Sequence, residues 1–308
     1  MEFTAPIVFD PIFMDRVWGG RRLEQLYGKR LPASRQIGES WELVDRTDAQ
    51  SVVAEGPLAG TTLHELWSVH RAPIFGEGLP AAQRFPLLVK LLDCEERLSV
   101  QVHPPAAIAE RFGGEPKTEM WFVMHADAGS EVFAGLKRGV TRERFEAALA
   151  SGDAASLLHR VPTRPGDALL VPSGRIHAIG AGNVIFEVQQ NSDTVYRVFD
   201  WNRAGLDGKP RTLHIRESLA SIDFDDAEPQ LIARQGERVA SCEYFRVERW
   251  EIDGERSCGT ESRFAVMAVL SGQIECGARR FGAGAVFLVP VSGGASLRGC
   301  GEVLRVSI

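Results

Sequence analysis

Short apolar runs separated by glycine and proline dominate this sequence of 308 residues. Its 31 glycines and 16 prolines fall largely between segments rich in β-branched and aromatic residues. Such close turn signals favour antiparallel strands, and runs such as 85–92 are too short to span a bilayer. We therefore expect a mostly β chain. The predicted strands cover residues 51–54, 86–92, 98–102, 120–124, 168–171, 184–188, 194–199, 244–252, 264–270, 286–289 and 302–308.

Helices are expected to be few and short. Thr62 followed by Glu65 forms a capping box, and Thr141 can cap a segment in which Phe145 and Leu149 share one face. The predicted helices cover residues 63–70, 104–112, 142–150 and 213–220.

One internal similarity bears on the domain organisation. Segments 165–177 and 282–295 each space a glycine and a proline six residues apart, and 121–124 resembles 264–267 upstream. The first copy ends in His177, whereas the second has Ala295 there. This pattern predicts two related β-barrel units, a polar one within 1–220 and a second within 221–308 without metal ligands. Chance similarity between strands bounded by glycine and proline is the alternative.

The charge balance limits the partners. With 35 Lys and Arg against 41 Asp and Glu, the net charge is −6, so the chain has no basic excess for nucleic acid or anionic membranes. A small anionic substrate held by local cations remains compatible. The five cysteines are scattered without a C-x-x-C pair, and the N-terminal segment does not resemble a signal peptide. We therefore expect a cytoplasmic protein.

Four polar residues stand at strand positions. Gln101 and His103 alternate with valine and therefore project from one face, Glu119 opens an aromatic strand, and His177 follows a Pro-Ser-Gly bend. Two imidazoles and one carboxylate suit a catalytic zinc with an open position, Gln101 being a weak fourth ligand, but Fe(II) uses the same set. Hydrogen-bonded core histidines and a solvated glutamate are the alternatives.

Two lysines and one arginine add positive charge. Only five of the 35 basic residues are lysines, yet Lys90 interrupts an apolar run and Lys117 lies two residues before Glu119. Both would face a pocket as point charges, unless Lys90 reaches water along an apolar surface. Asp193 and Arg197 share a strand face, either as a weak surface ion pair or with the arginine presented to an anion.

Six motifs together resemble the type I mannose-6-phosphate isomerases, in their short bacterial form. They are RVWGG at 16–20, IGESWE at 37–42, SVQVHP at 99–104, KTEMW at 117–121, PSGRIHAIG at 172–180 and SDTVYRVFDW at 192–201. The resemblance implies a double cupin (jelly-roll) barrel with short helical additions and one zinc ion per chain. It assigns the zinc ligands to Gln101, His103, Glu119 and His177. It also implies roles for Arg197, Lys117 and Asp193 in catalysis, with Lys90 left as the substrate-binding residue expected from composition. The usual acidic residues after the His-Pro pair are replaced here by Pro-Ala-Ala at 105–107, which affects the pocket rim.

The implied reaction is the interconversion of mannose 6-phosphate and fructose 6-phosphate through an enediol. It requires a base, an electrophile on the oxygens and positive charge for the enediolate. The base is left open between Lys117, Asp193 and a metal-bound water. A cupin-type Fe(II) dioxygenase and a non-catalytic sugar-binding protein are the alternatives. The expected partner is a small phosphorylated sugar, with no nucleic acid or membrane, and the chain is expected to be a monomer or small homo-oligomer.

Overall fold

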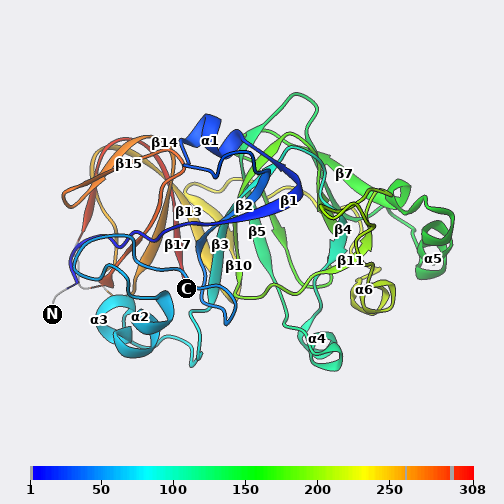
Figure 1. Cartoon of the computed structure of the whole chain (residues 1–308), viewed down its shortest axis with the longest axis horizontal. Coiled ribbons are helices and arrows are strands. Elements are labelled where there is room, and N and C mark those ends of the chain that lie inside the picture. Colours follow the sequence, from blue (N-terminus) through cyan, green and yellow to red (C-terminus); the bar gives the residue numbers. More distant parts are fainter. Residues whose placement is uncertain (1–2, 261, 292–294) are drawn as a thin grey trace.

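Three antiparallel sheets, which follow one another from left to right in Figure 1, make up most of the molecule. The computed structural model describes residues 3–260, 262–291 and 295–308. The expectation of a mostly β chain with short helices is confirmed. No helix among these residues has the length and apolar character needed to cross a membrane.

The first sheet forms the middle layer. In its central strands β2 and β3 every residue is buried, because each face of the sheet packs against another layer. Its strands, in spatial order, are β1 (Ile12–Gly20), β2 (Ile37–Leu43), β3 (Leu87–Cys94), β10 (Asn183–Gln190), β5 (Glu119–Ala126) and β8 (Ala168–Val171).

The second sheet lies on one side of the first and is short-stranded. Its strands, in order, are β11 (Tyr196–Phe199), β4 (Val100–Val102), β9 (His177–Ile179), β6 (Glu131–Leu136) and β7 (Leu158–Pro162). Trp121 and Ile185 of the first sheet pack with Ile179 of the second in one apolar cluster. Two helices lie beyond the second sheet, α5 (Arg142–Ser151) and α6 (Ile215–Ser221), and α4 (Ala106–Phe112) lies below the sheets in Figure 1. A 3-10 turn (Ala154–Leu157) follows α5.

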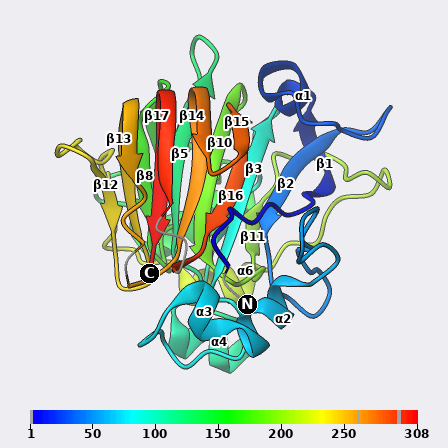
Figure 2. The same cartoon turned by 90° about the vertical axis from the view of Figure 1, so that its left-hand side faces the viewer.

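The third sheet covers the opposite side of the first, as Figure 2 shows. Its order is β12 (Arg238–Ser241), β13 (Arg246–Ser257), β17 (Ser296–Ser307), β14 (Ala265–Cys276) and β15 (Arg279–Gly282), and β16 (Val286–Val289) also pairs with β14. The long strands curl and enclose a core of their own that contains Trp250 and Met267. There the rings of Phe281 and Phe287 stack with centroids 3.9 Å apart.

The period of two along the middle strands separates two kinds of side chain. In β3, Leu87, Val89 and Leu91 belong to the apolar cluster shared with the third sheet. Lys90 and Leu92, on the other face, line a cavity toward the second sheet. The middle sheet is therefore apolar on one face and carries charged residues on the other.

The internal similarity in the sequence corresponds to a structural repeat. The amide of Gly166 donates to the carbonyl of Val123 at 2.8 Å, and the amide of Gly284 donates to that of Val269 at 2.8 Å. Both glycines have left-handed backbone angles, φ 95° and φ 82°, which favour glycine at the turn. The matching turn, strand and pairing in both copies make chance similarity the weaker interpretation.

Strand pairing corrects one detail of that repeat. Glu119 lies opposite Val171 in the first copy, and Ala265 lies opposite Val289 at the matching position of the second. The match of 121–124 with 264–267 is therefore wrong, and the two segments are offset by three residues from the structural alignment. The reason is that local sequence similarity does not specify how each strand pairs with its neighbour. Residues 292–294 of the second copy lie outside the described residues.

The predicted helices are confirmed with shifted ends. Thr62 caps α2 (Leu63–Val69), its hydroxyl accepting from the amide of Glu65 at 3.1 Å, and Thr141 caps α5. Two helices were not predicted, α1 (Arg22–Tyr27) and α3 (Arg71–Phe75).

The strand predictions are confirmed for ten segments and wrong for residues 51–54, which form only isolated bridges. Seven strands were missed. Polar residues interrupt the apolar pattern in several of them, and β9 has only three residues. The missed strands are β1, β2, β6, β7, β9, β12 and β15.

An aromatic cluster joins the helical segment to the sheets and predicts a stability effect. Phe75 is fully buried and lies 5.2 to 5.6 Å, centroid to centroid, from Phe264 and Phe85. We expect Phe75→Ala to lower the free energy of unfolding by about 3–5 kcal/mol, through lost burial and a cavity. Val69, 68% exposed in the preceding helix, supplies the control: Val69→Ala should change it by less than about 0.5 kcal/mol. Equal urea unfolding curves for the two variants would contradict the packing role of Phe75.

Candidate active site

Three buried side chains converge between the first two sheets. Ligand atoms of His103, Glu119 and His177 all lie within 4.8 Å of one another. Nε2 of His103 is 3.3 Å from Oε2 of Glu119, and Nε2 of His177 is 3.5 Å from Oε1. Gln101 lies beside them, its amide nitrogen 3.3 Å from Nε2 of His177. The four residues predicted as ligands are thus brought together by β4, β5 and β9.

The second nitrogen of each imidazole faces a backbone carbonyl. Nδ1 of His103 is 2.9 Å from the carbonyl oxygen of Thr194, and Nδ1 of His177 is 2.8 Å from that of Arg175. Donation from Nδ1 leaves the Nε2 lone pairs directed at Glu119, which is the tautomer that a metal ligand needs. Burial lowers the pKa of His103 and lowers that of His177 to about 3, so both rings are neutral.

The donor atoms at the centre are in contact with one another and with the ammonium of Lys117, but no hydrogen bond satisfies them. Nε2 of His103 and both carboxylate oxygens of Glu119 are buried without a hydrogen bond. Buried polar atoms are rarely left so, and three of them facing one point fit a bound cation. Two histidines, a glutamate and an open side are the donor set of a catalytic zinc site. The residues present therefore fit a divalent metal.

A cavity of about 280 Å³ opens beside this cluster. It is lined by five cations and three carboxylates, so the lining carries a net positive charge. They are Arg16, Lys90, Lys117, Arg197 and Arg211, with Glu39, Glu187 and Asp193. This lining suits a small polar ligand with an anionic group.

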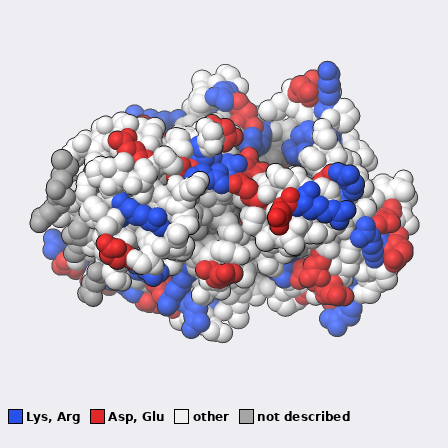
Figure 3. Space-filling model, turned by 90° about the horizontal axis from the view of Figure 1, so that it is seen from below, with Lys and Arg blue, Asp and Glu red and all other residues white. Residues whose placement is uncertain are grey.

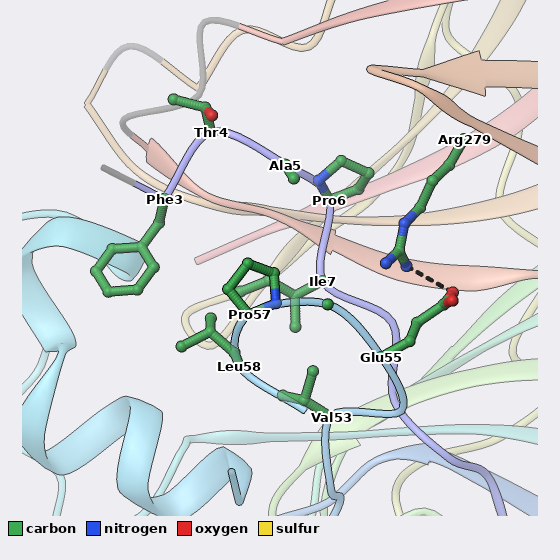
Figure 4. Close-up of a pocket in the computed structure, with 11 residues that line it drawn as sticks. Phe3, Thr4, Ala5, Pro6, Ile7, Val53, Glu55, Pro57, Leu58 and Arg279 are labelled. Carbon is green, nitrogen blue, oxygen red and sulfur yellow. Dashed lines mark ion pairs between the residues drawn. The ribbon is translucent and has the colours of Figure 1, made fainter. Parts of the chain in front are cut away.

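A second hollow, of about 190 Å³, lies near the N-terminus (Figure 4). Its wall is largely apolar, with Ile7, Pro57 and Leu58, and Glu55 pairs with Arg279 at 2.8 Å. On the face seen in Figure 3, acidic and basic side chains are interspersed without a continuous basic tract. Of these two hollows, the cavity beside the histidines is therefore the one lined mainly by charged side chains.

Lys90 points into the cavity. It is 4% exposed, and its Nζ lies 3.3 Å from Oε2 of Glu39 and 3.6 Å from Oε1 of Glu187. Burial alone would lower the pKa of Lys90, but the two carboxylates raise it above its usual value. Glu39 in turn accepts from Nε of Arg16 at 2.5 Å and from the Trp41 indole at 2.6 Å. The alternative in which Lys90 reaches bulk water does not hold.

Lys117 links the ligand cluster to the cavity. Its Nζ is 2.7 Å from Oε2 of Glu119 and 4.0 Å from Oε1 of Glu187. Burial alone would raise the pKa of Glu119, but Lys117 and the nearby imidazoles lower it well below the usual value. Glu119 is therefore an anion, as a metal ligand must be.

Glu187 is the functional candidate that the sequence reasoning missed. It is 4% exposed, its Oε2 accepts from the Trp121 indole at 3.1 Å, and its Oε1 has no hydrogen bond. Burial and the charge of Glu119 raise the pKa of Glu187 above its usual value. It interrupts the apolar run 184–188 as Lys90 interrupts 85–92, and the two residues pair across β10 and β3. The reasoning applied to Lys90 would have found it.

Arg197 and Asp193 both line the cavity. Arg197 forms hydrogen bonds with residues other than Asp193. Its Nε donates to the Ser99 hydroxyl at 3.3 Å, and its Nη1 donates to the carbonyl of Thr212 at 2.9 Å. Burial and the neighbouring Arg211 lower the pKa of Arg197. These contacts favour the presented arginine over a surface ion pair with Asp193. Arg16 and Arg211, also in the lining, were not predicted.

This arrangement brings a metal-binding cluster, a buried carboxylate and several cations to one small cavity. A metal with an open position can polarise hydroxyl or carbonyl oxygens. A carboxylate with a raised pKa can accept and return a proton beside them. The arginines can bind an anionic group at the other end of the same ligand.

Comparison with known proteins places the chain in a family. Residues 8–113 match the model for "Phosphomannose isomerase type I, catalytic domain". The chain is 36% identical over 305 residues to "Probable mannose-6-phosphate isomerase GmuF" of Bacillus subtilis, covering 93% of this chain and 94% of that one. It is 37% identical over 280 residues to "Mannose-6-phosphate isomerase ManA" of the same organism, covering 88% and 87%.

A solved structure agrees over the whole chain. The mannose 6-phosphate isomerase from Bacillus subtilis superposes with a TM-score of 0.88 and 32% identity, covering 99% of this chain and 100% of that one. The predicted double cupin fold with short helical additions is confirmed. The chain belongs to the type I phosphomannose isomerases.

Proposed function

We propose that this protein is a zinc-dependent isomerase that interconverts mannose 6-phosphate and fructose 6-phosphate through an enediol. The observation that carries the proposal is the buried cluster of His103, Glu119 and His177. It is connected through Gln101 and Lys117 to the cavity that Glu187 lines. Membership of the family supports the substrate.

His103, Glu119 and His177, with Gln101, would hold one Zn²⁺ per chain. Bound there, the metal would polarise the oxygens on C1 and C2 of the sugar. The second copy of the repeat has Ala265 at the position of Glu119 and Ala295 at that of His177, so we expect no metal there. We accordingly propose that residues 1–220 contain the catalytic region and that residues 221–308 form a second region without metal ligands.

Glu187 is the proposed base. In the forward direction its carboxylate takes the proton from C2 while the C1 oxygen gains a proton, which gives the enediol. The proton gained at O1 is balanced by the one that O2 releases in the second step, so no net proton is taken up. Returning the proton to C1, as the O2 hydroxyl loses its own, leaves the ketone at C2. Lys90 and Lys117 lie on either side of Glu187 and stabilise its anionic form before the first transfer and after the second. Asp193, also in the lining, is proposed to bind substrate hydroxyls.

Arg197 and the neighbouring arginines are proposed to face the negative charge of the ligand. Arg197 can stabilise the enediolate, and the excess of cations in the lining suits a phosphate group. The expected partner is thus a small phosphorylated sugar. We further propose that the protein is a monomer or small homo-oligomer that works in the cytoplasm.

The basic test is a coupled assay on mannose 6-phosphate before and after chelation. We expect turnover that needs the metal and is independent of dioxygen. Dependence on dioxygen would instead indicate a cupin-type dioxygenase. Sugar binding without turnover would indicate a binding protein.

Metal and activity should be lost together when a ligand is removed. We expect about one zinc per chain in the native protein, and background levels of both zinc and activity in His103→Ala and His177→Ala. Cys276→Ala, buried in the third sheet, should keep both. Two tightly bound ions per chain, or full activity in His177→Ala, would refute the proposed site.

Glu187→Gln should remove the base without removing the metal. Because the amide keeps the size but cannot accept the proton, kcat should fall by about 10²–10⁴-fold. Zinc content, measured by atomic emission, should stay at the native level. Glu302→Gln, a carboxylate substitution in the third sheet, is the matched control and should leave kcat unchanged. Native-like turnover by Glu187→Gln would return the role to Lys117, Asp193 or a metal-bound water.

Arg197→Ala should lower kcat more than it raises KM, since stabilisation of the enediolate belongs mainly to the transition state. Loss of one such donor costs about 10²–10³-fold in rate. Arg197→Lys should also be poor, because it loses the planar guanidinium, and both variants should retain zinc. A raised KM with unchanged kcat would mark Arg197 as a phosphate anchor instead, and unchanged kinetics would indicate a structural residue.

A further inference from the structure

The connection between β11 and α6, here called the strap (residues 200–214), begins and ends beside Arg197. The amide of His214 donates to the carbonyl of Arg197 at 2.7 Å, and the amide of Arg197 lies 3.3 Å from Nδ1 of His214. Two residues earlier in the strap, the carbonyl of Thr212 accepts from Nη1 of Arg197. The path of the strap thus determines what surrounds Arg197.

Asp200 fastens the two ends of the strap together. Its Oδ2 accepts from Nε of Arg211 at 2.7 Å, and its Oδ1 accepts from Nη2 of Arg211 at 2.6 Å. Oδ1 also accepts from Nε of Arg203 at 3.1 Å. The side chain of Asp200 is 7% exposed and that of Arg211 is 21% exposed. A two-point bond of this kind fixes the plane of the guanidinium as well as its position.

The backbone after Asp200 is built to turn the strap. Trp201 and Asn202 have φ of 57° and 56°, the left-handed region that costs free energy for any residue with a Cβ. The Trp201 indole donates to the carbonyl of Leu98 at 2.5 Å, and the guanidinium of Arg97 lies over its ring at 4.3 Å. These contacts hold a strained turn in place, which then directs the strap back toward the cavity.

The turn at Trp201 and the carboxylate of Asp200 together bring the guanidinium of Arg211 to the cavity. Arg211 lines it with Arg197, and burial and the charge of Arg211 lower the pKa of Arg197. Among the described residues, Nη1 of Arg211 and Nη2 of Arg197 have no hydrogen-bond acceptor. Two like charges held close, each with a free donor, form a site for a dianion.

We propose that Asp200 is a positioning residue, which holds Arg211 so that its guanidinium and that of Arg197 bind one phosphate group together. The inference rests on the proposed function for the identity of the ligand. Asp200 does not itself contact the substrate. Its effect on substrate binding passes through Arg211.

The role predicts a specific kinetic pattern. Hydrogen bonds to charged groups contribute substantially to the free energy of binding. Asp200→Asn and Arg211→Ala should therefore each raise KM for mannose 6-phosphate by about 10- to 100-fold. The inhibition constant for inorganic phosphate should rise with KM, while kcat changes by less than about threefold. The double variant should be no worse than Arg211→Ala, because both changes remove the same interaction.

A matched control separates positioning from stability. Arg249 and Glu302 form a similar part-buried pair in the third sheet, with Nη2 2.6 Å from Oε1. Glu302→Gln removes a carboxylate from that pair and should leave KM and the phosphate inhibition constant unchanged. If Asp200→Asn lowers the melting temperature but keeps the native KM, Asp200 is merely structural and the proposal is wrong.

Chemical rescue tests the contact directly. In Arg211→Ala, millimolar guanidinium chloride should restore the low KM, because Asp200 can hold the free guanidinium where the side chain was. Sodium chloride at the same concentration should not. The Asp200→Asn/Arg211→Ala variant should show no rescue. Equal rescue with and without Asp200 would overturn the proposal, and so would effects of the two substitutions on KM that multiply. If Asp200→Asn fails to fold, the rescue of Arg211→Ala still tests the proposal.

The same variants distinguish this proposal from the proposed function. If the native protein did not isomerise mannose 6-phosphate, the proposed function would fail. Calorimetry of inorganic phosphate binding would then still test whether Asp200 positions Arg211 beside Arg197. Weaker phosphate binding in Asp200→Asn and Arg211→Ala, restored by guanidinium only where Asp200 is present, supports it. Equal phosphate binding in all variants refutes it.

Discussion

Five charged side chains lie almost completely out of water between the first and second sheets. Lys90 and Lys117 carry two positive charges, and Glu39, Glu119 and Glu187 carry three negative ones. Each isolated buried charge would cost several kcal/mol, so the set persists only because its members lie within about 4 Å of one another in an alternating chain. The set is one charge negative, and a divalent cation would make it one charge positive. A site with that balance favours an anionic intermediate over a neutral sugar.

The layered fold makes this arrangement possible. In the middle sheet, one row of neighbours across the strands runs from Trp41 through Lys90 and Glu187 to Trp121. Their sequence neighbours project to the opposite face and pack against the third sheet. Beside Lys90, Glu187 and Trp121 that opposite face is apolar and buried, and the charged row borders the cavity on its own side. The low dielectric that strengthens the ion pairs therefore depends on strands more than a hundred residues further along the chain.

The sequence supported some parts of this site and not others for physical reasons. Gln101 lies within β4 and His103 directly follows it, whereas Glu119 and His177 open β5 and β9, so spacing and motif together located them. Lys90 was detectable as a charge inside an apolar strand, and Glu187 carries the same signal in a strand whose limits were predicted nearly correctly. Their pairing depends on the register of β3 with β10, which alternation does not specify. Arg211 lies in the strap, where there is no periodicity to read, and its place follows from Asp200 and the turn at Trp201.

The repeat shows how one architecture serves two purposes. In both copies a glycine turn leads into a strand that pairs with the preceding long strand in the same register. The first copy has Glu119 where the second has Ala265, and the second packs Phe281, Phe287 and Met267 in its interior. Side chains packed in this way fill the interior of the third sheet with apolar contacts. The third sheet thus buries the apolar face of the middle sheet, and the charged row occupies the opposite face of the same strands.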